Sequence, residues 1–309
     1  MEKEVSIIFV NYKTHDLLFN AIQSVINKSY GFTYEIIIVD NSCDDKEYEL
    51  IKNKYINTNI KVINSKENLG FGKANNLGSK FANGKYLYFL NTDTLLINNA
   101  IFELKEYLDN NPNTAVVGSN LFNRNNKPNS SYRYLEKNLK NEIKNNSLFN
   151  KIKLKIFKRR IDFNYSNKPL KIYGYVSGAS LMIRKNIFDS LNGFDKDIFM
   201  YAEESLLCYK VINDLKYNIY NIPCSKIIHF EGESMKNSSI YYNMFLDGNY
   251  IYYKKLFGEK EAVKFIKREY KIAYKKSKFY KLINKRKYNE LYNYSKICKN
   301  KLDSIINEQ

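Results

Sequence analysis

Two adjacent glutamates, Glu203 and Glu204, stand in the stretch MYAEESLLCYK, between an aromatic segment and an apolar run. A carboxylate that faces a cleft can act as the general base that deprotonates a substrate hydroxyl. The pair can also have a purely structural role, because the helix dipole stabilises acidic residues in a first helical turn by about 0.3–1 kcal/mol. This stretch alone is compatible with both interpretations.

Polar side chains follow three predicted strands at the point where each strand ends. They form the stretches Val10-Asn11-Tyr12, Asp40-Asn41-Ser42 and Asn91-Thr92-Asp93-Thr94. One Asp at a strand end is often a turn residue or a helix cap, but ligands of open α/β sheets bind beyond the carboxyl ends of the strands. Three such stretches therefore indicate a site, in which Asp40 could bind a ribose or base and Asp93 a divalent ion that bridges to phosphates.

The stretch NLGFGKANNLG, residues 68–78, is close to a dinucleotide-binding fingerprint but departs from it twice. Asn75 stands where the fingerprint has its third glycine, and the stretch follows the third predicted strand where the fingerprint follows the first. We therefore exclude nicotinamide binding. Gly70 and Gly72 are compatible with a close approach of the backbone to a ligand, and equally with a simple turn into a helix.

Histidine and cysteine are scarce in this chain. His15 lies in the first predicted helix, whereas His229 ends a predicted strand and precedes Gly232 and Ser234. A lone histidine is more often structural than a ligand, but this position favours an imidazole that completes a metal shell or contacts a phosphate. The four cysteines form no CxxC pair, so we expect buried, reduced thiols and neither a disulfide framework nor a zinc site.

These residues belong to an alternating series of strands and helices. Buried-strand patterns occupy residues 5–12, 34–42, 60–65, 85–91 and 114–119. Helical patterns occupy residues 14–29, 71–82 and 99–111, with Thr14 as the expected N-cap of the first. This alternation predicts an α/β fold with a mostly parallel sheet covered by helices. Further on we expect a helix near 202–213, a strand at 225–230 and, from 240 onward, helices dense in Lys and Tyr.

The positive charge is concentrated in two segments. The chain has 309 residues, 44% of them hydrophobic, and a net charge of +18, which residues 136–160 and 254–309 carry between them. Such mixtures of basic and apolar residues suit an anionic membrane surface, although single-stranded nucleic acid or plain solvated helix faces are alternatives. The sequence has neither a signal peptide nor a membrane-spanning apolar run, so we expect a cytoplasmic protein.

Seven motifs, taken in order, resemble the family 2 inverting glycosyltransferases, and in particular the bacterial rhamnosyltransferase-type members that build surface polysaccharides. The motifs are VSIIFVNYK, IIIVDNS, NLGFGKANN, YFLNTDT, SGASLMIRK, LNGFDKDIFMYAEESLLC and HFEGES. The resemblance implies a GT-A fold, that of nucleotide-diphospho-sugar transferases, in a domain over residues 1–250. A basic insertion at about 123–170 would interrupt this domain, and a basic helical extension, 251–309, would follow it.

The resemblance also implies a donor site. Val10 and Tyr12 would line the base, Asp40 would hold the base or ribose, and the segment Asn68–Asn76 would close over the nucleotide. The complete set of donor-binding residues would be Val10, Tyr12, Asp40, Asn68, Gly72, Asn91, Thr92, Asp93 and Gly178. The donor would be a nucleotide-diphosphate sugar, either a UDP-sugar or a dTDP-sugar, and rhamnose is favoured by resemblance alone.

Catalysis and metal binding follow from the same resemblance. Glu204 stands at the position of the catalytic base, and Glu203 is the next candidate. Asp93 and His229 would hold Mn²⁺ or Mg²⁺ at the diphosphate. Asn91 replaces the first acidic residue of the Asp-x-Asp position, and Leu206 replaces a later Asp of the acidic motif.

The acceptor would be a glycan or a lipid-linked sugar, and the protein would work at the inner face of the cell membrane, docked through residues 136–160 and 254–309. No nucleic-acid partner is expected. A glycosidase is disfavoured, because it would need two carboxylates flanking the scissile bond. The alternative to an enzyme is a catalytically silent nucleotide- or carbohydrate-binding homologue, which Asn91 and Leu206 would be compatible with.

Overall fold

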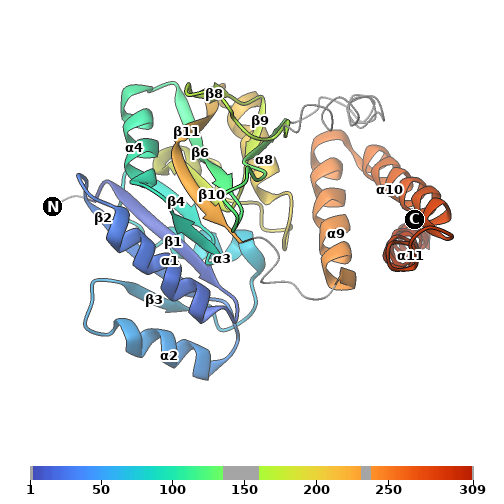
Figure 1. Cartoon of the computed structure of the whole chain (residues 1–309), viewed down its shortest axis with the longest axis horizontal. Coiled ribbons are helices and arrows are strands. Elements are labelled where there is room, and N and C mark those ends of the chain that lie inside the picture. Colours follow the sequence, from blue (N-terminus) through green and yellow to red (C-terminus); the bar gives the residue numbers. More distant parts are fainter. Residues whose placement is uncertain (1–2, 135–159, 231–237, 308–309) are drawn as a thin grey trace. The chain divides into compact units, whose positions relative to one another are not determined.

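The computed structural model describes residues 3–134, 160–230 and 238–307 (Figure 1). The fold divides into two compact units, one formed by residues 1–196 with 204–234 and the other by 197–203 with 235–309. The predicted domain boundary at residue 250 falls inside a helix of the second unit. Most of the predicted basic segment 136–160, and of the insertion around it, lies outside the described residues.

A nine-stranded sheet forms the centre of the first unit, in the order β3-β2-β1-β4-β10-β6-β11-β5, with β8 paired to β11. Its strands are β1 (Val5–Asn11), β2 (Tyr34–Asp40), β3 (Lys61–Asn64), β4 (Tyr86–Leu90), β5 (Thr94–Leu96), β6 (Thr114–Phe122), β8 (Leu170–Lys171), β10 (Ser180–Arg184) and β11 (Asn218–His229). Strands β1 to β4, β6 and β11 run in one direction, and β5, β8 and β10 run in the other. The predicted mostly parallel α/β sheet is confirmed. A separate two-stranded sheet pairs β7 (Tyr132–Tyr134) with β9 (Gly174–Val176).

Helices cover both faces of this sheet. They are α1 (His15–Lys28), α2 (Asp45–Tyr55), α3 (Gly70–Ser79), α4 (Ala100–Asn110), α7 (Lys185–Ser190) and α8 (Glu203–Asn213). Buried residues of α1, α2 and α4 pack against one face, and those of α7 and α8 pack against the other. Alternate strand residues therefore enter different cores, as the period of two along a strand requires.

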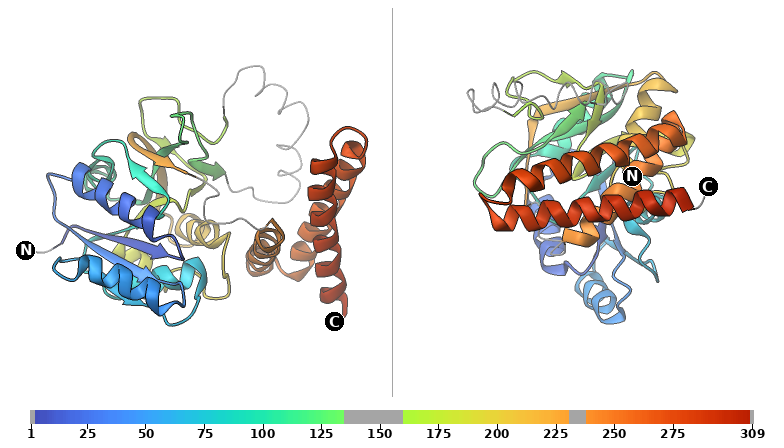
Figure 2. Two further views of the ribbon diagram at one scale, coloured as in Figure 1. Left: turned by 60° about the horizontal axis from the view of Figure 1, so that its bottom comes forward. Right: turned by 90° about the vertical axis from the view of Figure 1, so that its right-hand side faces the viewer.

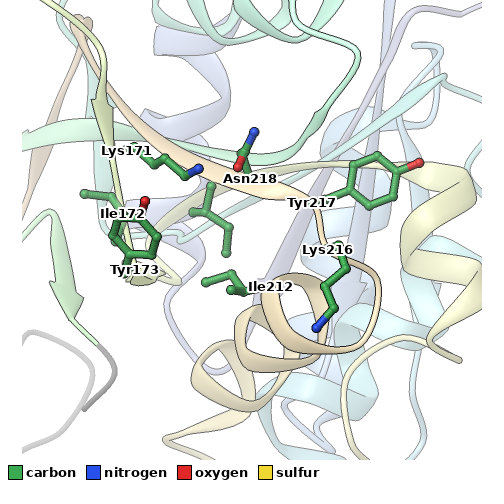
Figure 3. Close-up of a pocket in the computed structure, with 8 residues that line it drawn as sticks. Lys171, Ile172, Tyr173, Ile212, Lys216, Tyr217 and Asn218 are labelled. Carbon is green, nitrogen blue, oxygen red and sulfur yellow. The ribbon is translucent and has the colours of Figure 1, made fainter. Parts of the chain in front are cut away.

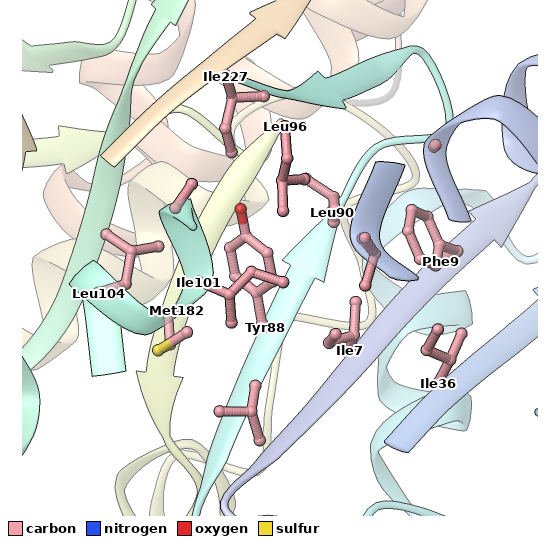
Figure 4. Close-up of a cluster of buried hydrophobic side chains, with 14 of the residues drawn as sticks. Ile7, Phe9, Ile36, Tyr88, Leu90, Leu96, Ile101, Leu104, Met182 and Ile227 are labelled. Carbon is pink, nitrogen blue, oxygen red and sulfur yellow. The ribbon is translucent and has the colours of Figure 1, made fainter. Parts of the chain in front are cut away.

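Figure 4 shows the first of these cores, where Ile7, Phe9 and Tyr88 of the strands meet Ile101 and Leu104 of α4. Each such side chain contributes about 1.5–3 kcal/mol when it is fully buried. The continuous apolar runs in the sequence are explained by this arrangement, because both faces of the central strands are covered.

Several elements differ from the sequence-based expectation, and three of them have a clear physical reason. Helix α2 was not predicted, because its apolar stripe of Ile51 and Tyr55 is set among charged residues. Strand β5 was not predicted either, and its three residues form a strand through antiparallel pairing with β11. Strand β11 begins at Asn218, well before the predicted start, and a register shift between Ile222 and Lys226 accommodates Pro223.

The burial of the cysteines also differs from the sequence-based expectation. All four lie within the described residues and are free thiols, as predicted. Cys208 and Cys298 are buried, but Cys43 and Cys224 are exposed, so the expectation of four buried thiols was wrong for two of them.

The second unit consists of three helices, α9 (Ser238–Phe257), α10 (Glu259–Tyr280) and α11 (Lys285–Asn307), together with residues 197–203. The predicted C-terminal helices are confirmed. Aromatic rings fill the space between the helices: Tyr253 stacks on Phe265 with centroids 4.9 Å apart, and Tyr242 lies 4.4 Å from Tyr294. Over the described parts of the chain, no helix combines the length and the apolar character needed to cross a membrane.

Oppositely charged side chains at the amino edge of the sheet form ion pairs. The Lys105 ammonium lies 2.9 Å from Glu4 and 3.0 Å from Asp109, and the Tyr86 hydroxyl donates to Asp109 over 2.6 Å. Burial alone would raise the pKa of Asp109. Hydrogen bonds from Lys85, Tyr86 and Lys105 outweigh it and lower the pKa from 3.8 to about 2.

We predict that Asp109→Asn lowers the free energy of unfolding at pH 7 by about 1–2 kcal/mol, measured by denaturant titration. The folded-state pKa is depressed, so this contribution is fully present above pH 3.8 and is lost as the pH falls toward about 2. The difference between wild type and variant should therefore shrink over that range. Equal stability of the two proteins at pH 7 would contradict the assignment.

Candidate functional site

Hydrogen bonds join the carboxyl ends of three parallel strands. The Asn11 side chain, at the end of β1, donates to Asp40 of β2 over 3.0 Å. Asn11 Oδ1 accepts from the Thr14 hydroxyl, which lies 3.0 Å from the hydroxyl of Thr92 beyond β4. Thr14 is the N-cap residue of α1, as predicted, but its side chain makes no capping bond to the helix and joins this strand-end network instead. The three polar stretches singled out in the sequence thus lie at one edge of the sheet.

Asp40 lies inside this network and is only 1% exposed. Its Oδ1 accepts from Asn11, and its Oδ2 accepts from the Ser42 hydroxyl over 2.8 Å. Burial raises the pKa of the Asp40 carboxyl, and the hydrogen bonds from Asn11 and Ser42 oppose that shift. In this structure Asp40 ties β1 to β2, and a contact with a base or ribose would use its remaining lone pairs.

The side chains around Asp40 include more accessible ones. Tyr12 is 45% exposed, and Val10 is partly exposed. The Asn41 side chain donates to Asn68 over 3.0 Å, and its oxygen accepts from the Leu69 N–H over 2.9 Å. The segment from residue 68 to 76, which was expected to close over the nucleotide, is largely the first part of the predicted helix α3. Asn41 fixes the beginning of that helix beside the strand ends.

A turn of three residues, Asn91 to Asp93, connects β4 to β5. Because β5 pairs with the end of β11, Thr94 lies opposite His229 in the sheet. The Asp93 Oδ1 atom and the His229 Nε2 atom are 3.3 Å apart. His229 Nδ1 is buried and, among the described residues, has no hydrogen-bond partner. A buried nitrogen of this kind is available to a ligand.

Asp93 and His229 are the two residues that the sequence suggested as metal ligands. In the ranges 3–134, 160–230 and 238–307, no group of three or more His, Cys, Asp or Glu side chains converges on one point. The carboxylate and imidazole are suitable donors for a divalent ion whose other ligands come from a diphosphate. Gly232 and Ser234, which follow His229 in its motif, lie outside the described residues.

Glu204 lies in the first turn of α8, facing the loop before β10. A methyl group built on Gly178 would lie 3.8 Å from the Glu204 carboxyl carbon and 3.8 Å from the Phe71 ring of α3. The neighbouring residue, Ala179, accepts a backbone hydrogen bond from Asn91 over 3.2 Å. The Gly178 loop therefore connects the Asn91–Asp93 turn to Glu204.

The backbone just before Glu204 is strained. Tyr201 has a φ of 68° and Ala202 a φ of 77°, in the left-handed region that residues with a side chain rarely occupy. Each such residue costs about 1 kcal/mol or more, and residues of this kind cluster at functional sites. The strain supports a functional role for the beginning of α8 beyond that of an ordinary helix start.

The electrostatic setting of Glu204 includes two residues that were not predicted. Burial raises the pKa of the Glu204 carboxyl, and the positive charge of Arg133 on β7 opposes the shift. Tyr175 on β9 interacts with both Arg133 and Glu204. Arg133 belongs to no motif in the sequence, and only the pairing of β7 with β9 brings it to Glu204.

The other acidic-motif positions are buried. Glu203 is the first residue of α8, and its side chain is buried. Leu206, which replaces the expected Asp, is also buried. Of the two glutamates, Glu204 is the one that lies against the Gly178 loop.

A small pocket at the other end of the sheet is separate from these residues. It has a volume of about 200 Å³ and is lined by Lys171, Ile172, Tyr173, Ile212, Lys216, Tyr217, Asn218 and Ile219 (Figure 3). Asn218 begins β11, whereas His229 ends it, and the length of that strand separates the two places. The pocket is therefore not part of the candidate site.

Comparison with known proteins gives a consistent result. The chain is 30% identical over 118 residues to the poly(ribitol-phosphate) beta-N-acetylglucosaminyltransferase TarP of Staphylococcus aureus, a match that covers 38% of this chain and 36% of the relative. It is 34% identical over 89 residues to the UDP-Glc:alpha-D-GlcNAc-diphosphoundecaprenol beta-1,3-glucosyltransferase WfaP of Escherichia coli, with 29% of this chain and 35% of the relative covered. The matches thus span about a third of the length of these relatives.

The crystal structure of GalNAc-T7 with UDP, GalNAc and Mn²⁺ is similar in fold, with a TM-score of 0.56 at 16% sequence identity over 78% of this chain and 47% of the other. This likeness supports the predicted GT-A fold. The profile of the family described as Glycosyl transferase family 2 matches residues 6–189. Because that match covers more than half of the chain and includes the strand ends and the Asn91–Asp93 turn, this protein belongs to glycosyl transferase family 2.

Proposed function

We propose that this protein is an inverting glycosyltransferase, which moves a sugar from a nucleotide-diphosphate donor to a hydroxyl of a glycan or lipid-linked acceptor in cell-surface polysaccharide synthesis. The observation that carries the proposal is the placement of Glu204. Its carboxyl lies against the Gly178 loop, which is hydrogen-bonded to the turn that contains Asp93. A candidate base and a candidate diphosphate site are thereby held on one scaffold.

In this proposal Glu204 accepts the proton of the acceptor hydroxyl. The acceptor oxygen forms a bond to the anomeric carbon as the bond from that carbon to the diphosphate oxygen breaks, and the nucleotide diphosphate leaves with the electron pair. One displacement inverts the anomeric centre. The raised pKa of Glu204 makes it a stronger base than an exposed glutamate.

Asp93 and His229 would bind Mn²⁺ or Mg²⁺ together with the diphosphate. When bound, the ion supplies positive charge that stabilises the leaving group. The 3.3 Å separation of Asp93 Oδ1 and His229 Nε2 supports this assignment, because the two donor atoms lie side by side. The Mn²⁺ and UDP in the GalNAc-T7 structure support the use of a divalent ion in proteins of this fold.

The donor and acceptor are proposed by class. The names of TarP and WfaP favour glucose- or N-acetylglucosamine-type donors, so rhamnose has no support beyond the motif resemblance. The diphosphoundecaprenol acceptor in the name of WfaP favours a lipid-linked acceptor here too. An acceptor of that kind would place the protein at the inner face of the cell membrane, where its basic segments would meet anionic lipid.

We expect Glu204→Gln to lower kcat by about 100-fold to 10,000-fold, because the amide cannot accept the proton. Affinity for UDP, measured by calorimetry, should be unchanged. The matched variant Glu203→Gln should retain most of the transfer activity, and Asp109→Asn, at the opposite edge of the sheet, should keep it fully. If Glu204→Gln remains as active as wild type, Glu204 is not the base.

The alternative, a catalytically silent nucleotide- or carbohydrate-binding homologue, makes a different prediction. It predicts that wild type binds UDP or dTDP but neither transfers nor hydrolyses any donor in a panel of nucleotide sugars with Mn²⁺ or Mg²⁺. Turnover of one donor would exclude it.

We predict that Arg133→Gln shifts the acid limb of the pH profile of kcat/KM to higher pH. Arg133 favours the ionised form of Glu204, so its removal raises the pKa of the base further. The base is then protonated, and inactive, up to a higher pH. The profile of Arg133→Lys, which keeps the charge, should stay near that of wild type. An unchanged acid limb in Arg133→Gln would show that Arg133 does not act on the base.

Removal of the metal ligands should weaken nucleotide binding. We expect Asp93→Asn and His229→Gln each to reduce the Mn²⁺-dependent affinity for UDP by about 10–100-fold, measured by calorimetry. Neither variant should alter UDP binding in the presence of EDTA, because the ion is then absent in all proteins. Wild-type affinity that is equal with Mn²⁺ and with EDTA would rule out the metal site.

A further inference from the structure

The turn between α10 and α11 exposes apolar side chains to solvent. Leu282 is 96% exposed, Phe279 66% and Ile283 66%. The two helices lie side by side as a hairpin, and these residues form its tip (Figure 2). Scattered apolar residues are normal on a protein surface, but three within five positions of one turn form a patch.

Basic residues flank this tip on both helices, and we call them the basic collar. Between Glu269 and Glu290 the sequence has eight basic residues and no acidic one. They are Lys271, Lys275, Lys276, Lys278, Lys281, Lys285, Arg286 and Lys287, and all eight are exposed. Within the described part of the chain, none of the eight lies within 4.0 Å of a carboxylate oxygen. Among the described residues, therefore, no carboxylate pairs with their charge.

The turn is held by its own hydrogen bonds. The N–H groups of Ile283 and Asn284 donate to the carbonyl of Tyr280 over 3.1 Å and 2.9 Å. The Asn284 side chain then accepts from the Lys287 N–H over 2.9 Å, which caps the first turn of α11. Two lysines also cover tyrosine rings near the tip, Lys278 over Tyr274 and Lys287 over Tyr280. The exposed apolar side chains are thus presented by an ordered turn.

We propose that this turn, residues 279–283 with the surrounding basic collar, inserts into the surface of an anionic phospholipid bilayer. Apolar side chains at the centre would enter the acyl boundary, and the lysines and arginine would meet the phosphate headgroups. The proposal deepens the membrane docking suggested above and rests on it, and it assigns that docking to one element of the second unit.

The arrangement fits a bilayer better than two other partners. A second copy of this chain would bring the same collar of like charges together, which opposes association. A nucleic acid would stack its bases on aromatic rings, but Leu282 and Ile283, two of the three exposed apolar side chains, are aliphatic. Aliphatic side chains inside a cationic collar are complementary to acyl chains beneath anionic headgroups.

A single tryptophan can test insertion directly, because the chain contains none. We would prepare the full chain with Leu282→Trp, and as a matched control Ile306→Trp, which is 59% exposed at the other end of α11. On vesicles of phosphatidylcholine with phosphatidylglycerol, the fluorescence of the residue-282 probe should shift to shorter wavelength and that of the residue-306 probe should not. Vesicles of phosphatidylcholine alone should shift neither.

Flotation of the otherwise unchanged chain gives the second readout. The double variant Leu282→Ser/Ile283→Ser should lower binding to the anionic vesicles about tenfold or more, because apolar area no longer enters the bilayer. The triple variant Lys281→Gln/Lys285→Gln/Arg286→Gln should lower it about 100-fold. The matched variant Lys46→Gln/Lys52→Gln/Lys54→Gln removes the same charge from α2 and should change binding little.

The proposal would be overturned by an unshifted residue-282 probe on anionic vesicles, or by equal flotation of the serine variant and wild type. It would also be overturned if the wild-type chain forms a dimer that the serine variant cannot form, while the serine variant binds lipid as well as wild type does. Tighter binding of the tip to single-stranded nucleic acid than to vesicles would also overturn it. Donor hydrolysis without vesicles should be the same in the tip variants and wild type. Its absence in wild type would count against the proposed glycosyl transfer, not against docking.

Discussion

Parallel pairing of β1 with both β2 and β4 is the constraint on which the candidate site depends. It brings the carboxyl ends of the three strands to one edge, where each strand ends in polar residues. Buried polar groups at such an edge must be hydrogen-bonded, and Asn11 meets this requirement by joining Asp40 to the Thr14–Thr92 pair. The network fixes the strand ends, and the turn that contains Asp93 is built on that fixed base.

Charged groups at the two edges of the sheet have different surroundings. At the amino edge, Lys105 and Asp109 form an ion pair. At the carboxyl edge, His229 Nδ1 has no partner among the described residues, and Glu204 has a raised pKa. Strain in the backbone before Glu204 adds to the contrast. Paired charges thus lie at the amino edge, and groups with a missing partner or a shifted pKa lie where ligands are expected.

The second unit needs a strong interior for a different reason. Its sequence is dense in lysine, and a helical bundle with so much like charge needs a strong interior. Tyrosine and phenylalanine rings packed between α9, α10 and α11 supply it. Gly248 allows α9 to approach the backbone of Tyr201 closely. The same packing leaves Leu282 outside, at the turn where positive charge is densest.

Continuous apolar runs in the sequence were enough to place β1, β2 and β4, because both faces of these strands are buried. The helices from residue 240 onward were also expected from the sequence. The ordered motifs likewise singled out Asp93, His229 and Glu204. Tertiary structure alone decided the rest. Helix α2 has too narrow an apolar stripe to be recognised, and β5 exists only through its partner β11. Arg133 reaches Glu204 because β7 pairs with β9, and both oxygens of Asp40 are engaged by its neighbours. Contacts between residues distant along the chain depend on how whole elements pack, and no local pattern of residues encodes them.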